Sequence, residues 1–329
     1  MNSPLLPESL CQPSAGLLQR SDQADLRAEE AQRDDAAGNF NRIGTWFGKN
    51  DALYAALNAA RLDRYVMWLW RCLEVRAHLR WNRDGFEREM AQIGRISGPA
   101  LVVGSAPNPV RPEGVDANWF RISVNASQLV LSHFRLPEPH LTIFQPKIKF
   151  NDENRQAYWR ALAGCGTEHL LFMVNGKNDG TIAPFLSSRG YRAPRISNIK
   201  EVTKTAVVAD ITGRCLLSPF VGQRSVSNGI FAAMLALKLG ARPVVMSGFS
   251  MEDGYFHADQ VPAKRNHVAP DLLACKTAAK RNWPLYASDP IFAAVTGLPL
   301  WQADKQTEMS APSLSRELDA IAQATVEKR

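Results

Sequence analysis

Short apolar runs recur through the centre of the chain, and most of them end at glycine or at a polar residue. Runs of about four to eight residues with such boundaries are typical of buried strands in a parallel sheet. The predicted strands are 100–105, 119–124, 140–144, 169–174, 206–211, 243–248 and 284–288. Helical stretches lie between several of them, notably 228–240 and 270–282. This alternation predicts an α/β fold with a single Rossmann-like, mostly parallel sheet and helices on both faces.

The regions on either side of this centre have a different pattern. Residues 1–45 include an acidic stretch without aromatic side chains, which predicts a disordered or loosely helical N-terminus. Residues 46–98 read as an N-terminal helical extension, and residues 309–329 as a polar C-terminal helix. We therefore expect one catalytic domain over residues 99–308.

Within the helical extension, residues 61–83 combine apolar periodicity with basic charge. Tyr65, Leu69 and Leu73 recur at helical spacing, and the segment has six arginines, two acids and three tryptophans. A basic helix of this kind is suited to the surface of an anionic membrane, which predicts peripheral membrane association. The alternative is a helix docked on the rest of the protein, with tryptophans buried and arginines in water.

Composition narrows the classes of partner and compartment. A net charge of +7 favours anionic partners, but no nucleic-acid-binding motif is present, so no nucleic-acid partner is expected. The five cysteines are widely spaced, without zinc-ligand spacing, which indicates a reducing compartment and no structural metal. No signal-peptide pattern or apolar run of about 20 residues is visible. These features predict a cytoplasmic protein that could lie peripherally on the inner membrane.

Two predicted strand ends carry candidate ligand-binding residues. The first strand ends in Gly104 and Ser105, a small-residue turn whose free N–H groups can meet a phosphate or ribose. It is neither a dinucleotide fingerprint nor a Walker loop. Asn125 follows the next strand and should lie at the carboxyl edge of the sheet, where α/β proteins bind ligands. A turn-forming asparagine would explain Asn125 equally well.

A third candidate segment spans residues 224–257. Ser225, Ser227 and Asn228 can cap the apolar helix that follows them. The start of that helix presents unpaired N–H groups and the positive end of the helix dipole to an anion. The strand after the helix leads into a loop that carries Tyr255.

The fourth candidate is His267, directly before the last predicted helix of the centre. The positive end of a helix dipole favours the neutral form of an imidazole, which a general base requires. The alternative is a surface histidine in a basic loop beside Lys264 and Arg265.

Taken in order, residues 100–301 resemble sialyltransferases, especially the bacterial enzymes of glycosyltransferase family 42 and more distantly the animal enzymes of family 29. VVGSAPNPV and ISVNASQ resemble the large sialyl motif, and SVSNGIFAAMLALKLGARPVVMSGFSM resembles the small motif. NHVAPDLLACKTAAKRNWPLYASDP is similar to the family 42 segment that bears the catalytic histidine. The resemblance implies a GT-A-like variant of the Rossmann-like sheet, a CMP-sugar donor, a glycan or glycolipid acceptor, and no metal or cofactor.

The resemblance also implies roles for single residues. His267 would be the base that deprotonates an acceptor hydroxyl in a single inverting displacement, and Tyr255 would hold the departing phosphate. The residues that would bind the CMP moiety are Gly104, Ser105, Asn125, Gln145, Ser227, Asn228 and Gly229. The family usually has a second tyrosine shortly after the small-motif strand, whereas this chain has Ser250 and Met251 there.

The sequence thus predicts a metal-independent bacterial glycosyltransferase that transfers sialic acid or a related acidic sugar to a (lipo)oligosaccharide, as in lipopolysaccharide biosynthesis. Two alternatives stay open: a non-catalytic nucleotide-binding protein, and a metal-dependent phosphotransferase of a related α/β fold. Turnover of a CMP-sugar in the presence of EDTA would argue against both.

Overall fold

The apolar runs form a seven-stranded parallel sheet in a computed structural model of the chain. The strands are β1 (Ala100–Val103), β2 (Phe120–Val124), β3 (Leu141–Phe144), β4 (His169–Val174), β5 (Arg195–Lys200), β6 (Val244–Ser247) and β7 (Leu285–Ala287). Their order in the sheet is β5-β4-β3-β2-β1-β6-β7. This arrangement confirms the single parallel sheet expected from the sequence.

The structure describes residues 63–149, 153–174, 180–217, 225–251 and 267–303. Apart from Asp63, all of them belong to the unit Arg64–Arg329. The segments expected at 1–45 and 309–329 lie outside the described residues, and the domain boundaries stay predictions. Within the described part, no helix is long and apolar enough to cross a membrane.

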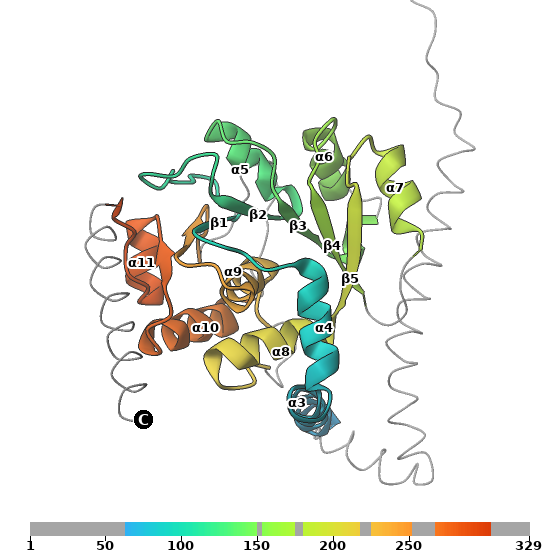
Figure 1. Ribbon diagram of the computed structural model, residues 1–329, viewed down its shortest axis with the longest axis vertical. Helices are drawn as coiled ribbons and strands as arrows, with labels where there is room; N and C mark the ends of the chain where they lie inside the picture. Colours follow the sequence, from blue (N-terminus) through green and yellow to red (C-terminus); the bar gives the residue numbers. More distant parts are fainter. Residues whose placement is uncertain (1–62, 150–152, 175–179, 218–224, 252–266, 304–329) are drawn as a thin grey trace, which may run out of the picture. The chain divides into compact units, whose positions relative to one another are not determined.

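Helices cover both faces of the sheet, as predicted (Figure 1). They are α3 (Asp63–Trp81), α4 (Arg83–Ile93), α5 (Gln128–His133), α6 (Glu153–Ala161), α7 (Ile182–Ser188), α8 (Glu201–Thr212), α9 (Asn228–Leu239), α10 (Val268–Lys280) and α11 (Pro290–Thr296), with the 3-10 turns η1 (Asn125–Ser127) and η2 (Pro146–Lys149). Figure 1 shows α5, α6 and α7 on one side of the sheet, and α8, α9 and α10 on the other.

Side-chain alternation along the strands divides the core into two layers. Val102, Ile122 and Ile143 point to the face where they pack with α8, α9 and α10. Leu101 and Val103 point to the opposite face and pack with α5. Helix α9 is buried nearly all round, which its continuous apolar sequence predicts.

The chain reverses its direction across the sheet at β1. From β1 it moves outward through β2 to β5, then returns to place β6 on the free side of β1. At such a reversal the loops after the two central strands diverge, and ligands of α/β proteins bind in the crevice between them. The topology therefore directs attention to the carboxyl ends of β1 and β6.

One predicted strand is wrong. Residues 206–211 lie in α8, which ends at Gly213 in the left-handed conformation (φ 73°). β-Branched residues favour strands only weakly, and burial against neighbouring elements overrides the preference. Helix α8 is buried over most of its length and packs against α9 and α10.

The strand that the sequence missed is β5. Its residues, RISNIK, are mostly polar, and only Ile199 is fully buried. A strand at the edge of the sheet pairs on one side alone and tolerates polar side chains. Apolar runs in the sequence therefore do not predict β5.

In helix α3, only some of the apolar residues at helical spacing are buried. Cys72 and Val75 are buried, whereas Leu69 and Leu73 are about half exposed at 53% and 49%. The alternative with buried tryptophans does not hold for Trp70 and Trp81, which are 45% and 86% exposed. The arginines of the helix contribute to a surface that is apolar as well as basic.

We predict an acid-sensitive step in stability from His169, the buried first residue of β4. Burial, and secondly the charge of Arg195, lower its pKa from 6.5 to about 4. The unfolded chain therefore binds the proton more readily, so the free energy of unfolding should fall as the pH drops from 6.5 towards 4. Urea denaturation at several pH values should show a shallower fall in His169→Gln. Equal slopes in the wild type and His169→Gln would contradict the prediction.

Candidate functional site

The carboxyl ends of β1 and β6 are joined by backbone hydrogen bonds at two glycines. The N–H of Gly104 donates to the carbonyl oxygen of Ser247 (2.8 Å), and the N–H of Ala106 donates to that of Gly248 (2.8 Å). A Cβ on Gly104 would lie 2.3 Å from the Gly248 oxygen, so no side chain fits there. Gly104, predicted from its turn, is thus required for the close approach of the two loops.

A third glycine connects this crossing to the start of α9. A Cβ on Gly229, in the first turn of α9, would lie 2.4 Å from the ring of Phe249. The same ring lies beside Gly104, at 3.1 Å from its hypothetical Cβ. The structure therefore brings together two predicted residues, Gly104 and Gly229, across a single phenylalanine.

Asn125 lies where the sequence placed it, directly after β2. It is half-buried and has a φ of 52°, in the left-handed region that asparagine tolerates better than most residues. The hydroxyl of Ser127 accepts from the N–H of Val124 (2.8 Å) and donates to the carbonyl oxygen of Val103 (2.7 Å). This hydroxyl ties the end of β2 to the end of β1 and holds the turn that carries Asn125.

The predicted polar residues after the first three strands share one edge of the sheet. Ser105 comes after β1, Asn125 after β2 and Gln145 after β3, and all three are half-buried. Because β1, β2 and β3 are parallel neighbours, their carboxyl ends meet at this edge. Hydroxyl and amide groups in such a row can both donate to and accept from a nucleoside.

The first turn of α9 carries two further predicted residues. Ser227 is the N-cap, and its hydroxyl accepts from the N–H of Ile230 (3.3 Å). The side-chain oxygen of Asn228 accepts from the ammonium of Lys204 (3.1 Å). Because an ammonium can only donate, the amide NH₂ of Asn228 points away from Lys204 and remains a donor for another group.

Lys204 is a candidate site residue that the sequence did not reveal. It lies in α8, its side chain is 6% exposed, and its ammonium is 3.6 Å from the carboxylate of Glu201. It lies two residues before the run that resembled a strand, so no pattern connected it with α9. A buried ammonium beside a helix N-terminus makes this end of α9 attractive to an anion.

His267 occupies the N-cap position of α10, as expected from the sequence. Its Nδ1 lies 2.7 Å from the carbonyl oxygen of Ser225. A carbonyl oxygen can only accept, so Nδ1 carries the hydrogen and Nε2 holds the lone pair of the neutral ring. This tautomer is the one in which Nε2 can remove a proton from a hydroxyl.

A buried carboxylate fixes His267 relative to α9. Asp271, in the first turn of α10, is fully buried, and its Oδ1 accepts from the backbone N–H of Ser227 (2.7 Å). Together with the bond from His267 to Ser225, this contact joins the start of α10 to the N-cap of α9. An acidic residue in the first turn of a helix is common, so the sequence contained no signal for this role.

One predicted catalytic residue, Tyr255, lies outside the described residues, and its role stays a prediction. The part of the chain that the structure describes contains no group of three or more histidine, cysteine, aspartate or glutamate side chains that could hold a metal ion. The residues that the structure does bring together are Gly104, Ser227, Asn228, Gly229 and His267.

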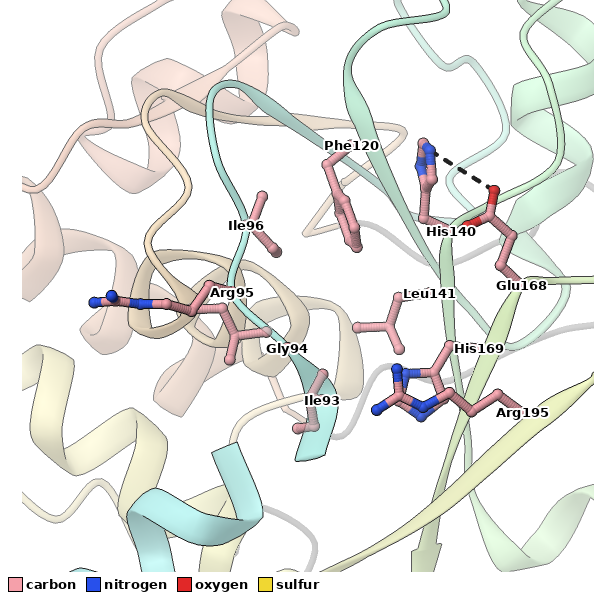
Figure 2. Close-up of a pocket in the computed structure, with 11 residues that line it drawn as sticks. Ile93, Gly94, Arg95, Ile96, Phe120, His140, Leu141, Glu168, His169 and Arg195 are labelled. Carbon is pink, nitrogen blue, oxygen red and sulfur yellow. Dashed lines mark ion pairs between the residues drawn. The ribbon is translucent and has the colours of Figure 1, made fainter. Parts of the chain in front are cut away.

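A cavity of about 240 Å³ lies at the opposite, amino-terminal edge of the sheet (Figure 2). The first residues of several strands line it, among them Phe120, His169 and Arg195. Figure 2 shows His140 directed towards Glu168, with 3.9 Å between Nε2 and Oε1. No predicted site residue lines this cavity, so it is separate from the candidate site.

Comparison with solved structures finds a likeness of fold at low sequence identity. The sialyltransferase CstII from Campylobacter jejuni in complex with CMP-3FNeuAc is 13% identical over 63% of this chain and 86% of that chain, with a TM-score of 0.43. CstII in complex with a trisaccharide acceptor and CMP is 13% identical over 62% and 87%, with a TM-score of 0.43. The α-2,3-sialyltransferase Cst-I from the same organism is 13% identical over 62% and 80%, with a TM-score of 0.39.

No family model matches the chain, and no curated protein matches it significantly. At these identities and TM-scores the likeness is one of fold alone and carries no information about the site residues. The chemistry of the site therefore depends on the residues described above.

The hydrogen bond to Ser225 predicts the protonation pattern of His267. Neutral imidazole in water prefers the form with hydrogen on Nε2, whereas the carbonyl contact requires hydrogen on Nδ1. Long-range ¹H–¹⁵N spectra, recorded at a pH where the His267 ring is neutral, should therefore show this ring with the hydrogen on Nδ1. A neutral His267 ring protonated on Nε2 would contradict the structure.

Proposed function

We propose that this protein is a glycosyltransferase that takes an acidic sugar, such as sialic acid, from a CMP-sugar and passes it to a glycan hydroxyl, with His267 as the base. The observation that carries the proposal is the pair of hydrogen bonds between α10 and the N-cap of α9, His267 to Ser225 and Asp271 to Ser227. They hold a proton acceptor next to an anion-attracting helix terminus. Transfer from a sugar phosphate needs both groups at once.

On the donor side, the start of α9 would receive the phosphate. As the bond from the sugar carbon to the phosphate oxygen breaks, negative charge grows on that oxygen, and fixed donors stabilise it. The candidates are the N–H groups of the first turn, the amide of Asn228 and the ammonium of Lys204. We assign the adjacent row of Ser105, Asn125 and Gln145 to the ribose and base.

The ammonium of Lys204 bears on one difference from the resembled family, the lack of a second tyrosine after β6. Ser250 and Met251 stand where the resembled family usually has it. We assign part of the stabilisation of the phosphate to Lys204, whose ammonium is directed to the first turn of α9 by Asn228. Charge-assisted hydrogen bonds of this kind are about twice as strong as neutral ones.

On the acceptor side, Nε2 of His267 would take the proton from a sugar hydroxyl as its oxygen attacks the donor carbon. The attack comes from the side opposite the phosphate, so one displacement inverts the configuration at that carbon. In this scheme the charge on the phosphate is met by side chains and by the helix dipole, which is why we propose metal-independent transfer. Tyr255 is proposed as a further phosphate ligand on the strength of the family resemblance.

The acceptor we propose is a bacterial lipo-oligosaccharide, modified on the cytoplasmic side of the inner membrane. An acidic donor sugar and a basic protein of net charge +7 fit this assignment. The identity of the sugar is the first quantity to measure.

A donor screen tests the proposal. The purified chain is incubated with CMP-sialic acid or CMP-Kdo and a lipo-oligosaccharide, with EDTA present, and released CMP is measured. We expect turnover by the wild type and a loss of about 10²- to 10⁴-fold in His267→Ala, the range expected for a general base. CMP affinity, measured by calorimetry, should be retained in that variant.

The exposed His133 is the matched control, since His133→Ala should keep full activity. Undiminished turnover in His267→Ala would remove His267 as the base. CMP binding without turnover of any CMP-sugar would indicate a non-catalytic nucleotide-binding protein, and no CMP binding at all would overturn the donor site.

Lys204 provides an independent test of the donor side. Loss of a charged hydrogen-bond donor costs about 1.5–3 kcal/mol, so Lys204→Met should weaken CMP binding by about 10- to 100-fold, and Lys204→Arg should restore part of the affinity. Lys238→Met is the matched control, because Lys238 lies at the other end of α9 and pairs with Glu87 and Asp210. Equal CMP affinity in Lys204→Met, Lys238→Met and the wild type would contradict the assignment.

A further inference from the structure

Helix α3 is attached to the rest of the described chain by one face. Val75 is 2% exposed, and the indole N–H of Trp68 donates to the carbonyl oxygen of Leu217 (2.8 Å). The thiol of Cys72 is buried against Cys215; burial and this contact raise its pKa to about 12, so it stays an uncharged thiol. Figure 1 shows α3 at the periphery, beside α4 and on the far side of α8 from the sheet.

The opposite face of α3 is apolar and exposed. Tyr65, Leu69 and Leu73 follow one another at intervals of four residues and are 43%, 53% and 49% exposed. Trp70 and Trp81, about three turns apart on an adjoining line, are 45% and 86% exposed. Five of the ten large hydrophobic side chains that are exposed in the described chain lie on this one helix. They therefore form one exposed apolar surface, whereas single exposed apolar side chains are common on any protein.

Arginines accompany this surface. Arg76 and Arg80 continue the line of Leu69 and Leu73 along the helix, and both are exposed. Arg71 is exposed on another side of the helix, and the acidic side chain described on α3 is that of Glu74, which is exposed one turn after Trp70. The face therefore combines aliphatic side chains, indole rings and guanidinium groups, which together suit the interface between water and acyl chains.

We propose that this outer face of α3, formed by Tyr65, Leu69, Trp70, Leu73 and Trp81 with Arg76 and Arg80, docks on the surface of an anionic lipid bilayer. Anionic headgroups complement the arginines, while the leucines and indoles enter the boundary with the acyl chains. A second copy of the chain is a poorer occupant. A two-fold contact through this face would bring the arginines of the two copies towards each other.

The end of α3 lies close to the helix that contributes Lys204 to the candidate site. The end of α3, at His78 and Trp81, shares a surface hollow with Val202 in the first turn of α8. Lys204, which holds Asn228, lies in the same turn of α8. If the proposed function holds, a docked bilayer would lie on the side of the molecule where α8 begins and would present lipid-anchored acceptors there; the docking itself is independent of that function.

The experiment is co-sedimentation of the full chain with vesicles. One set contains phosphatidylcholine with about one third phosphatidylglycerol, and the other phosphatidylcholine alone. We expect binding at least about tenfold stronger to the anionic vesicles, weakened by high salt. In the double variant Leu69→Gln/Leu73→Gln that binding should fall about tenfold or more, because the leucines are the apolar part of the contact.

The matched control is Ile291→Gln/Val295→Gln. Both residues are exposed apolar side chains four positions apart on another helix, α11, at 70% and 43% exposure. This control should keep wild-type binding, and both double variants should keep the wild-type melting temperature, because all four side chains face solvent.

Three results would overturn the proposal. They are equal binding to neutral and anionic vesicles, equal loss of binding in both double variants, and no binding to either vesicle. Light scattering that shows a dimer in the wild type and a monomer in Leu69→Gln/Leu73→Gln would assign this face to a second copy of the chain instead. None of these readouts depends on CMP-sugar turnover, so failure of the docking and failure of the proposed function are separable.

Discussion

The buried carboxylate of Asp271 is the contact on which the geometry of the site depends. From the first turn of α10 it accepts the backbone N–H of Ser227, just ahead of α9, while His267 at the start of α10 donates to the carbonyl of Ser225. One residue thus satisfies a buried donor, positions a helix terminus and sets the distance from that terminus to an imidazole. A buried carboxylate is costly unless it is paired, so this arrangement tolerates little rearrangement.

The topology of the sheet brings the start of α9 to the edge where the other candidate residues lie. Because β6 returns beside β1, α9 begins close to the crossing of Gly104 and Gly248, and the ring of Phe249 fills the space between that crossing and Gly229. The anion-attracting start of α9 and the polar row after β1, β2 and β3 consequently belong to one edge of the sheet. The cavity at the other edge contains none of these groups.

The candidate site and the outer surface of α3 are connected through a single helix, α8. Its first turn supplies Lys204 to Asn228, and Val202 in that turn lies beside the end of α3. The segment after α8 receives the indole of Trp68 and the thiol of Cys72. Helix α8 therefore connects α3 to the start of α9 in the candidate site.

The sequence by itself determined the fold class, six of the seven strands, the start of α9 among three capping candidates, the position of His267 just before a helix, and the edge position of Asn125, because strand periodicity, capping and turn chemistry are local properties. It did not determine β5 or α8, since an edge strand needs little apolar pattern and a buried helix can contain β-branched residues. Only the tertiary structure decided that Lys204 contacts Asn228, that Asp271 contacts Ser227, and that α3 packs through Val75 rather than Leu69. These contacts join residues 24 and 44 positions apart, for Lys204 to Asn228 and Asp271 to Ser227, and no local pattern encodes which distant backbone or side-chain group a buried charge will meet.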